Sequence, residues 1–147
     1  MSKFLHQKLR RRGFSLVELM LVLTVMCIVV SMAAPSFRRS VEQSQADIAG
    51  ANLRAIWTAQ RIYWLEYRTY TDDLSVLESL DLLDPTIVSA TDRYVYTIPS
   101  ADDSTFIASA TRSGSVRWAG QLTIDQDGEI SGVIQATGLP DIDPGFL

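Results

Sequence analysis

The sequence predicts an α+β protein in which one long N-terminal helix packs on a small antiparallel sheet of about four strands. Three observations support this fold class. Residues 14–35 are apolar enough and long enough to cross a membrane as a helix. Helical periodicity continues over residues 36–68, and short β-rich segments separated by turn residues follow Pro85. The 147 residues leave room for one modest domain beyond the apolar segment.

The apolar segment contains one residue that does not suit a lipid environment. Its polar side chains are those of Ser15, Glu18, Thr24 and Ser31. A carboxylate one turn inside such a helix costs about 2–3 kcal/mol unless it finds a partner. Glu18 is therefore a candidate functional residue.

A basic leader precedes the apolar segment. Five of the 13 basic residues lie in residues 1–13, whereas all 17 acidic residues follow them. This asymmetry predicts a cytoplasmic amino terminus and a head outside the inner membrane. Without the leader, the side-chain charge is 8 − 17 = −9.

The sequence GFSLVEL over residues 13–19 resembles the processing motif of bacterial type IV pilins and of type II secretion pseudopilins. The resemblance implies that prepilin peptidase cleaves between Gly13 and Phe14 and methylates the new amino terminus of Phe14. It also implies that Glu18 acts in assembly and that Pro35 kinks the helix. Many members close a carboxy-terminal loop with a disulfide, which Cys27 alone cannot form, and members often have glycine at that position.

The physical chemistry of the cleaved segment agrees with this resemblance. Cleavage would expose an α-amine on Phe14 that is largely cationic at neutral pH. Phe14 and Glu18 lie four residues apart on one helix face. The amine can therefore meet Glu18 of its own chain or of a neighbouring subunit, and either pairing neutralises two charges in lipid.

Two other interpretations of the N-terminal segment stay open. Residues 11–16 also resemble a twin-arginine export signal, and residues 31–33 could serve as a small-residue cleavage site. The segment could also be a plain membrane anchor. The length of the apolar segment and Glu18 within it favour the pilin-type leader.

The second half of the helix has an unusually broad apolar surface. Val41, Ile48, Ala55 and Ile62 recur every seven residues, and Trp57 and Trp64 lie on another side. One interpretation gives this helix two partners, its own domain and neighbouring helices in an assembly. The other is a helix half sunk in a small domain with the tryptophans at its edge.

The head, residues 69–147, begins with a short helix and continues as a meander. Thr71 or Asp72 could cap the helix, and Asp84-Pro85 would end it. We expect strands near residues 93–98, 105–111, 116–124 and 129–134, with hairpin-turn signals at residues 113–114 and 127–128. Residues 139–147 are expected to be a loose tail.

Residue types missing from the chain exclude much enzymatic chemistry. Beyond the leader there is no lysine or histidine, and Cys27 lies in the apolar segment, so nucleophilic triads and imidazole or thiolate zinc sites cannot form. We expect neither an enzyme nor a cofactor. A weak candidate for calcium is the set Asp125, Asp127 and Glu129, for which a solvated hairpin turn is the favoured interpretation.

The charge of the chain disfavours nucleic acid as a partner. Arg93, Arg112 and Arg117 could contact phosphates, but a net side-chain charge of −9 disfavours DNA binding.

The resemblance implies a type IV pilin-like fold with residues 1–13 as leader, 14–35 as transmembrane and assembly helix, 36–68 as its amphipathic continuation and 69–147 as head. It implies a structural subunit of a type IV pilus or a type II secretion pseudopilus. The expected partners are homologous subunits, prepilin peptidase, the inner membrane, and an assembly platform with its ATPase. The alternative is a membrane-anchored periplasmic binding module that does not polymerise.

Overall fold

The structure is a computed structural model that describes residues 14–145, so the leader and Gly13 lie outside it. The chain divides into two compact units, one up to Arg38 and one from Arg39 onward, which are described separately.

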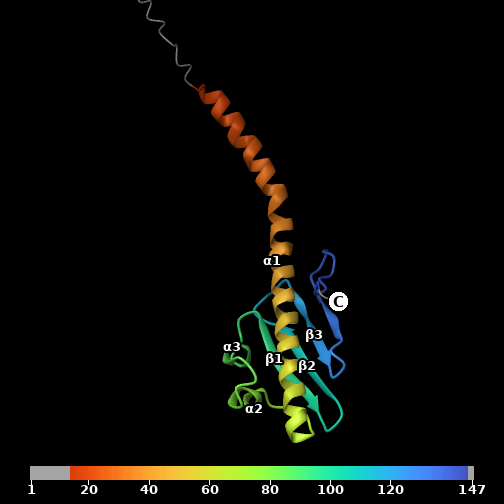
Figure 1. The fold of residues 1–147 in the computed structure, drawn as a ribbon. Helices are drawn as coiled ribbons and strands as arrows, with labels where there is room; N and C mark the ends of the chain where they lie inside the picture. Colours follow the sequence, from red (N-terminus) through yellow and green to blue (C-terminus); the bar gives the residue numbers. More distant parts are fainter. Residues whose placement is uncertain (1–13, 146–147) are drawn as a thin grey trace, which may run out of the picture. The chain divides into compact units, whose positions relative to one another are not determined.

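Helix α1 (Leu16–Tyr67) has 52 residues and belongs to both units (Figure 1). It begins directly after Ser15, whose carbonyl accepts the N–H of Leu19 at 3.1 Å. Pro35 lies inside α1, so the helix continues past the proline, as the periodicity of residues 36–68 predicts. The kink at Pro35 stays a prediction.

The head contains a four-stranded antiparallel meander, which confirms the predicted fold class. Neighbouring strands pair in the order β1-β2-β3-β4. Their bounds are β1 (Tyr94–Ala101), β2 (Phe106–Arg112), β3 (Ala119–Asp125) and β4 (Ile130–Gln135). The register of β1 shifts between Thr97 and Ser100, on either side of Pro99, which suits an edge strand because proline lacks the N–H that a ladder needs.

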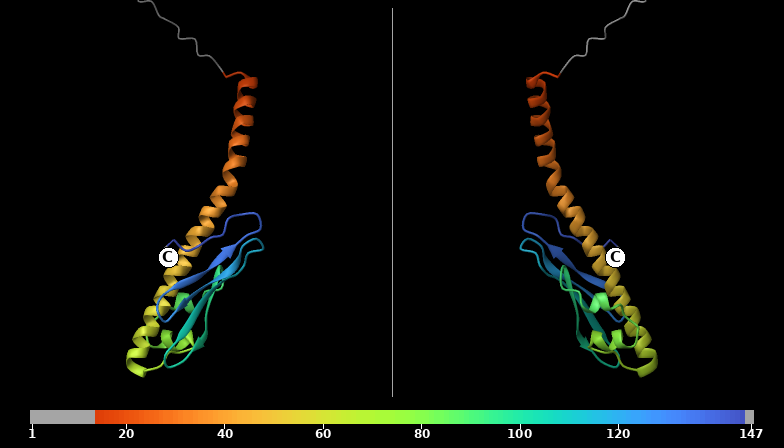
Figure 2. Two further views of the ribbon diagram at one scale, coloured as in Figure 1. Left: turned by 90° about the vertical axis from the view of Figure 1, so that its right-hand side faces the viewer. Right: turned by 90° about the vertical axis from the view of Figure 1, so that its left-hand side faces the viewer.

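The core lies between one face of this sheet and the second half of α1, which runs along that face (Figure 2). Small and branched side chains of α1 supply one side of it: Ala46, Ala49, Leu53, Ile56 and Ala59, none more than 1% exposed. The sheet supplies alternating residues, among them Phe106, Ala108, Ala110, Leu122 and Ile124. Alanines at the crossing let the helix approach the sheet closely, which is the close packing that protein interiors show.

The seven-residue apolar row of α1 is not part of that core. Val41, Ile48 and Ile62 are 36%, 50% and 45% exposed. The second half of α1 thus has two apolar sides, one buried against its own sheet and one facing solvent.

The segment between α1 and β1 differs from the prediction in two respects. The cap of α2 (Leu74–Ser79) is Asp73, whose carboxylate accepts the N–H of Ser75 at 2.8 Å, and not Thr71 or Asp72. The Thr71 hydroxyl instead accepts the N–H of Asp73 at 3.2 Å, one step before the helix.

A second short helix, α3 (Pro85–Val88), was not predicted. Asp84-Pro85 starts this helix and does not end the preceding one. Proline is favoured at the first helical position because its missing N–H would have had no partner there, and Asp84 caps the turn by accepting the N–H of Thr86 at 2.7 Å.

The predicted loose tail is wrong for the described residues up to Gly145. Ile142 is fully buried and exchanges two backbone hydrogen bonds with Ile134, of 3.0 and 2.9 Å. An apolar side chain between two prolines therefore finds a site beside β4 that its local sequence does not reveal.

The same tail is also bound by side chains one turn apart on α1. Arg39 donates to the carbonyl of Asp141 at 3.4 Å, and Gln43 donates to the carbonyl of Asp143 at 2.6 Å. Asp47 accepts the N–H of Gly145 at 2.8 Å. In this chain these polar contacts hold the tail in place without a disulfide.

We expect Ile142→Ala to lower the stability of the head by about 2–5 kcal/mol, because it leaves a cavity at a fully buried position. Thermal unfolding of the detergent-solubilised chain, followed by tryptophan fluorescence, measures the change. Ile107→Ala is the matched control, because Ile107 is 42% exposed. Equal melting temperatures for the two variants would contradict the docked tail.

The turn between β1 and β2 makes the stability of the head depend on pH. Backbone N–H groups of Ser104 and Thr105, together with their hydroxyls, bind the Asp102 carboxylate and hold its pKa well below the usual range. A group whose folded pKa is lowered stabilises the fold above its unfolded pKa, and that contribution is lost as pH falls.

Asp102→Asn should therefore lose less stability than the wild type when pH is lowered from about 7 to about 3. Melting temperatures at the two pH values test this. Parallel losses in both proteins would show that Asp102 does not contribute to the pH dependence.

Candidate assembly site

The first unit presents an apolar helix surface that nothing in the described chain covers. Every large apolar side chain from Phe14 to Met32 is exposed, between 43% for Val22 and 77% for Phe14. By length and composition, α1 is the one helix of the described chain that could cross a membrane, with a mean hydropathy of 2.5 over its most apolar window. Such a surface is stable in lipid or against other helices, because burying each side chain contributes about 1.5–3 kcal/mol.

Two hydroxyls within this surface are bound by the backbone of the helix, whereas the one carboxylate is not. Thr24 donates its hydroxyl to the carbonyl of Met20 at 2.8 Å, and Ser31 donates to the carbonyl of Ile28 at 2.7 Å. Nothing within residues 14–145 donates to Glu18. The Glu18 carboxylate lies in the first turn of α1, where the positive end of the helix dipole favours an anion but does not neutralise it.

The structure describes one side of the predicted cleavage bond. Phe14 precedes the first residue of α1 and is 77% exposed. Gly13 lies outside the described residues. Phe14 and Glu18 are thus near the same end of α1, which is the placement that the predicted pairing requires.

In the second unit, Arg112 is engaged internally, which corrects its proposed role as a phosphate contact. Arg112 Nε donates to Glu42 Oε1 and Nη2 donates to Oε2 at 3.1 Å, with both side chains 5% exposed. Arg112 also donates to the carbonyl of Arg93 at 3.0 Å and covers the ring of Tyr94 at 5.6 Å. Burial and the Glu42 carboxylate raise the pKa of the Tyr94 hydroxyl.

The sequence contains a faint signal for this ion pair. Glu42 precedes Ala46 and Ala49 by four and seven residues, so a charged side chain lies on the helix face that becomes the core. A charge on a buried face requires a partner, but helical spacing alone does not identify that partner as Arg112.

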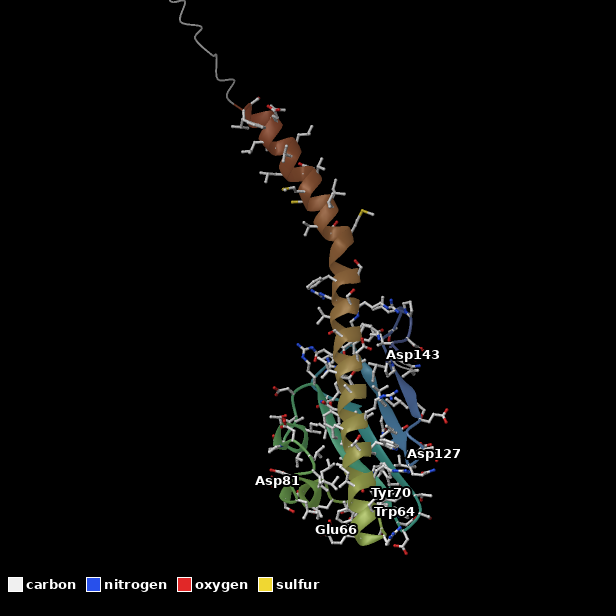
Figure 3. The ribbon with its side chains drawn as sticks, in the orientation of Figure 1. Trp64, Glu66, Tyr70, Asp81, Asp127 and Asp143 are labelled. Carbon is white, nitrogen blue, oxygen red and sulfur yellow. The ribbon has the colours of Figure 1, made fainter. Side chains whose placement is uncertain are left out.

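The two tryptophans of α1 attach the helix to two turns of the sheet. Trp57 Nε1 donates to the carbonyl of Gln126 at 3.0 Å, and Trp64 Nε1 donates to the carbonyl of Asp103 at 2.9 Å. Gly128, at φ +83°, lets the turn between β3 and β4 approach the Trp57 ring closely. Figure 3 shows Trp64 beside Tyr70 and Asp127 farther along the same side of α1.

Two of the three carboxylates proposed as a weak calcium site, those of Asp125 and Asp127, accept hydrogen bonds within the turn between β3 and β4. Asp125 accepts the N–H groups of Asp127 and Glu129 at 3.0 and 3.1 Å, and Gln126 donates to Asp127 at 3.0 Å. Among the described residues, no three His, Cys, Asp or Glu side chains are grouped so that they could hold a metal ion.

Comparisons with known proteins place the N-terminal segment in a recognised family. The prokaryotic N-terminal methylation motif matches residues 8–34. The chain is 38% identical over 63 residues to the type IV major pilin protein PilA of Myxococcus xanthus, covering 43% of this chain and 29% of that protein. It is 24% identical over 107 residues to the type IV wide pilus major component PilA4 of Thermus thermophilus, covering 73% of this chain and 78% of that protein. The chain thus matches about a third of the length of the first relative and most of the second.

Glu42→Gln should destabilise the head by about 3–5 kcal/mol, because it leaves the buried Arg112 guanidinium without its counter-charge. Chemical denaturation in detergent measures the change. The double variant Glu42→Leu with Arg112→Met removes both charges and should recover most of the loss. A loss below about 1 kcal/mol for Glu42→Gln would mean that the pair is solvated.

Proposed function

We propose that this chain is a structural subunit which polymerises into a type IV filament through α1. The basis for this proposal is that the chain belongs to the type IV pilin family. The observation that carries this proposal is the apolar surface of residues 14–32, which is exposed along its whole length. Lipid can cover that surface before assembly and helices of neighbouring subunits can cover it afterwards. Residues 1–13 are the leader, 14–35 the transmembrane and assembly segment, 36–68 its amphipathic continuation and 69–147 the head.

Processing is the first step of this proposal. The matched motif includes residues 13 and 14, and prepilin peptidase would cleave between Gly13 and Phe14 and methylate Phe14. The basic leader keeps the amino terminus in the cytoplasm, so the head faces the periplasm. An assembly platform and its ATPase would then extract the processed subunit from the inner membrane.

Glu18 selects the position of an incoming subunit. The new α-amine of Phe14 and the Glu18 carboxylate are each costly in lipid alone, and pairing between subunits neutralises both. A single buried polar contact sets register in the same way in coiled coils. Support comes from the absence of any donor to Glu18 among residues 14–145.

Exposed apolar residues on the second half of α1 extend the assembly surface into the head. Val41, Ile48 and Ile62 lie on the side of the helix that the sheet leaves uncovered. We assign this row to packing between the helices of neighbouring subunits, which favours the interpretation that gives α1 two partners.

The names of the relatives favour a pilus over a secretion pseudopilus. Both are described as major components of type IV pili. We therefore propose that this chain is a pilin of a type IV pilus. The alternative is a membrane-anchored binding module that does not polymerise. The two hypotheses differ in whether Glu18 is needed for assembly.

The intact mass and amino-terminal sequence of the protein from its native membrane test the processing step. We expect a chain that begins with N-methylated Phe14. A chain that begins near Ala34 would instead indicate an exported soluble domain, and the filament proposal would fail.

Glu18→Ala should be cleaved and methylated normally but should reduce filament yield by at least about tenfold, because the α-amine is left without a partner in lipid. Filaments sheared from cells and detected by immunoblot give the yield, and mass spectrometry gives the processing. The control Glu129→Ala removes an exposed carboxylate of the head and should assemble normally. Normal filaments from Glu18→Ala would refute this role.

A further inference from the structure

A stripe of alternating arginines and tryptophans runs along one side of α1. It consists of Arg54, Trp57, Arg61, Trp64 and Arg68. Spacings of three and four residues place Arg54, Trp57, Arg61 and Trp64 on one face of α1, and Arg68 is the first residue after the helix. Arg61 covers the Trp57 ring at 5.4 Å and Arg68 covers the Trp64 ring at 5.0 Å.

The tryptophans make this stripe a rigid surface. Each indole N–H is bound to a backbone carbonyl of a turn in the sheet, at 3.0 Å for Trp57 and 2.9 Å for Trp64. An arginine stacked on a fixed ring loses little further conformational entropy when it binds an anion, so the surface is preorganised.

Two of the three arginines of the stripe form no ion pair among the residues that the structure describes. Neither Arg61 nor Arg68 has a carboxylate within 4.0 Å among residues 14–145, and both are exposed. The guanidinium donors of these two side chains remain available because stacking engages only their faces. An acidic partner would satisfy both the charge and the donors.

The complementary surface lies on the other side of the same helix. Residues 69–92 contain no basic residue and carry the carboxylates Asp72, Asp73, Glu78, Asp81, Asp84 and Asp92. We call residues 72–84 the acidic segment; it includes α2 and the cap of α3. Figure 3 shows Asp81 on the opposite side of α1 from Trp64 and Asp127.

We propose that the arginine–tryptophan stripe of one subunit binds the acidic segment of a second copy of this chain. This inference rests on the proposed filament function and names the contact between heads that accompanies it. Two different complementary surfaces on opposite sides of one subunit make a heterologous contact, which propagates as an open helical filament unless the rotation closes a ring. Opposite charges also fix the order of the surfaces, because stripe against stripe would repel.

A nucleic acid is the less suitable anion. Residues 39–147 carry seven arginines and 16 carboxylates, so their side-chain charge is 7 − 16 = −9. The electrostatic field of this net negative charge repels a polyanion at long range. The acidic segment of a second subunit presents only a short, local group of carboxylates.

Charge reversal on full-length protein in its native cells tests the contact. We expect Arg61→Glu to reduce the yield of sheared filaments at least about fivefold, and Arg61→Glu with Glu78→Arg to recover most of it. Arg117→Glu is the matched control, since it makes the same change of charge at an exposed arginine outside the stripe and should assemble as the wild type does. Equal yields for Arg61→Glu and Arg117→Glu would overturn the inference while leaving the filament function intact.

Cross-linking identifies the partner surface independently. Thr58 and Ser79 are exposed beside the stripe and at the end of α2. The variant with Thr58→Cys and Ser79→Cys, treated as filaments with a water-soluble bis-maleimide, should give a ladder of multimers. Each single variant, which also contains Cys27, should give no ladder. Filaments of the double variant that give no ladder would overturn the proposed contact. If the wild-type chain forms no filaments, the filament function is overturned as well.

A DNA-binding measurement separates the remaining possibility. Purified wild-type and Arg61→Glu filaments are mixed with labelled duplex DNA and sedimented. We expect no difference in retained DNA. Full assembly by Arg61→Glu together with a loss of retained DNA would overturn the proposal in favour of a nucleic-acid partner.

Discussion

The uncovered apolar surface of residues 14–32 is the constraint on which the rest of this molecule depends. No described part of the chain shields it, so lipid or other helices must do so. Within that surface the hydroxyls of Thr24 and Ser31 are bound by the backbone one turn away, and the Glu18 carboxylate is the charged group without a donor among residues 14–145. A carboxylate on an apolar surface destabilises the monomer in lipid, and a cationic group of a second subunit can remove that cost.

The second half of α1 also has apolar side chains that need to be covered, and the sheet covers only some of them. Alanines at positions 46, 49 and 59 let the sheet lie close, while the branched side chains of Val41, Ile48 and Ile62 are left toward solvent. The Glu42–Arg112 pair and the tryptophan N–H bonds then hold the helix to the sheet at both ends of the contact. These contacts fix the position of the second half of α1 on the sheet.

Features with a local cause were predictable from the sequence, and those with a distant cause were not. The long helix and the four strands follow from periodicities of 3.6 and 2 residues. The cap of α2 was misplaced because Thr71, Asp72 and Asp73 all carry suitable oxygens, and only the path of the chain selects Asp73. No local pattern relates Ile142 to Ile134 or Arg112 to Glu42, so the docked tail and the buried pair required the structure. Within the candidate site, Phe14 and Glu18 rest on the motif, and the sequence also indicated a broad apolar surface on α1, but only the structure shows which side of it meets the sheet.

Positive and negative side chains are distributed unevenly over the surface of the head, which its net charge does not show. Residues 69–92 contain six carboxylates and no basic residue, whereas Arg54 and Arg61 share one face of α1 and Arg68 directly follows the helix. Apolar packing between helices is strong but non-directional, so by itself it tolerates sliding and rotation. Charged groups on opposite sides of a rigid head penalise wrong registers through like-charge contacts. A filament built from this chain would therefore derive its cohesion from the apolar helix and its order from Glu18 and the stripe.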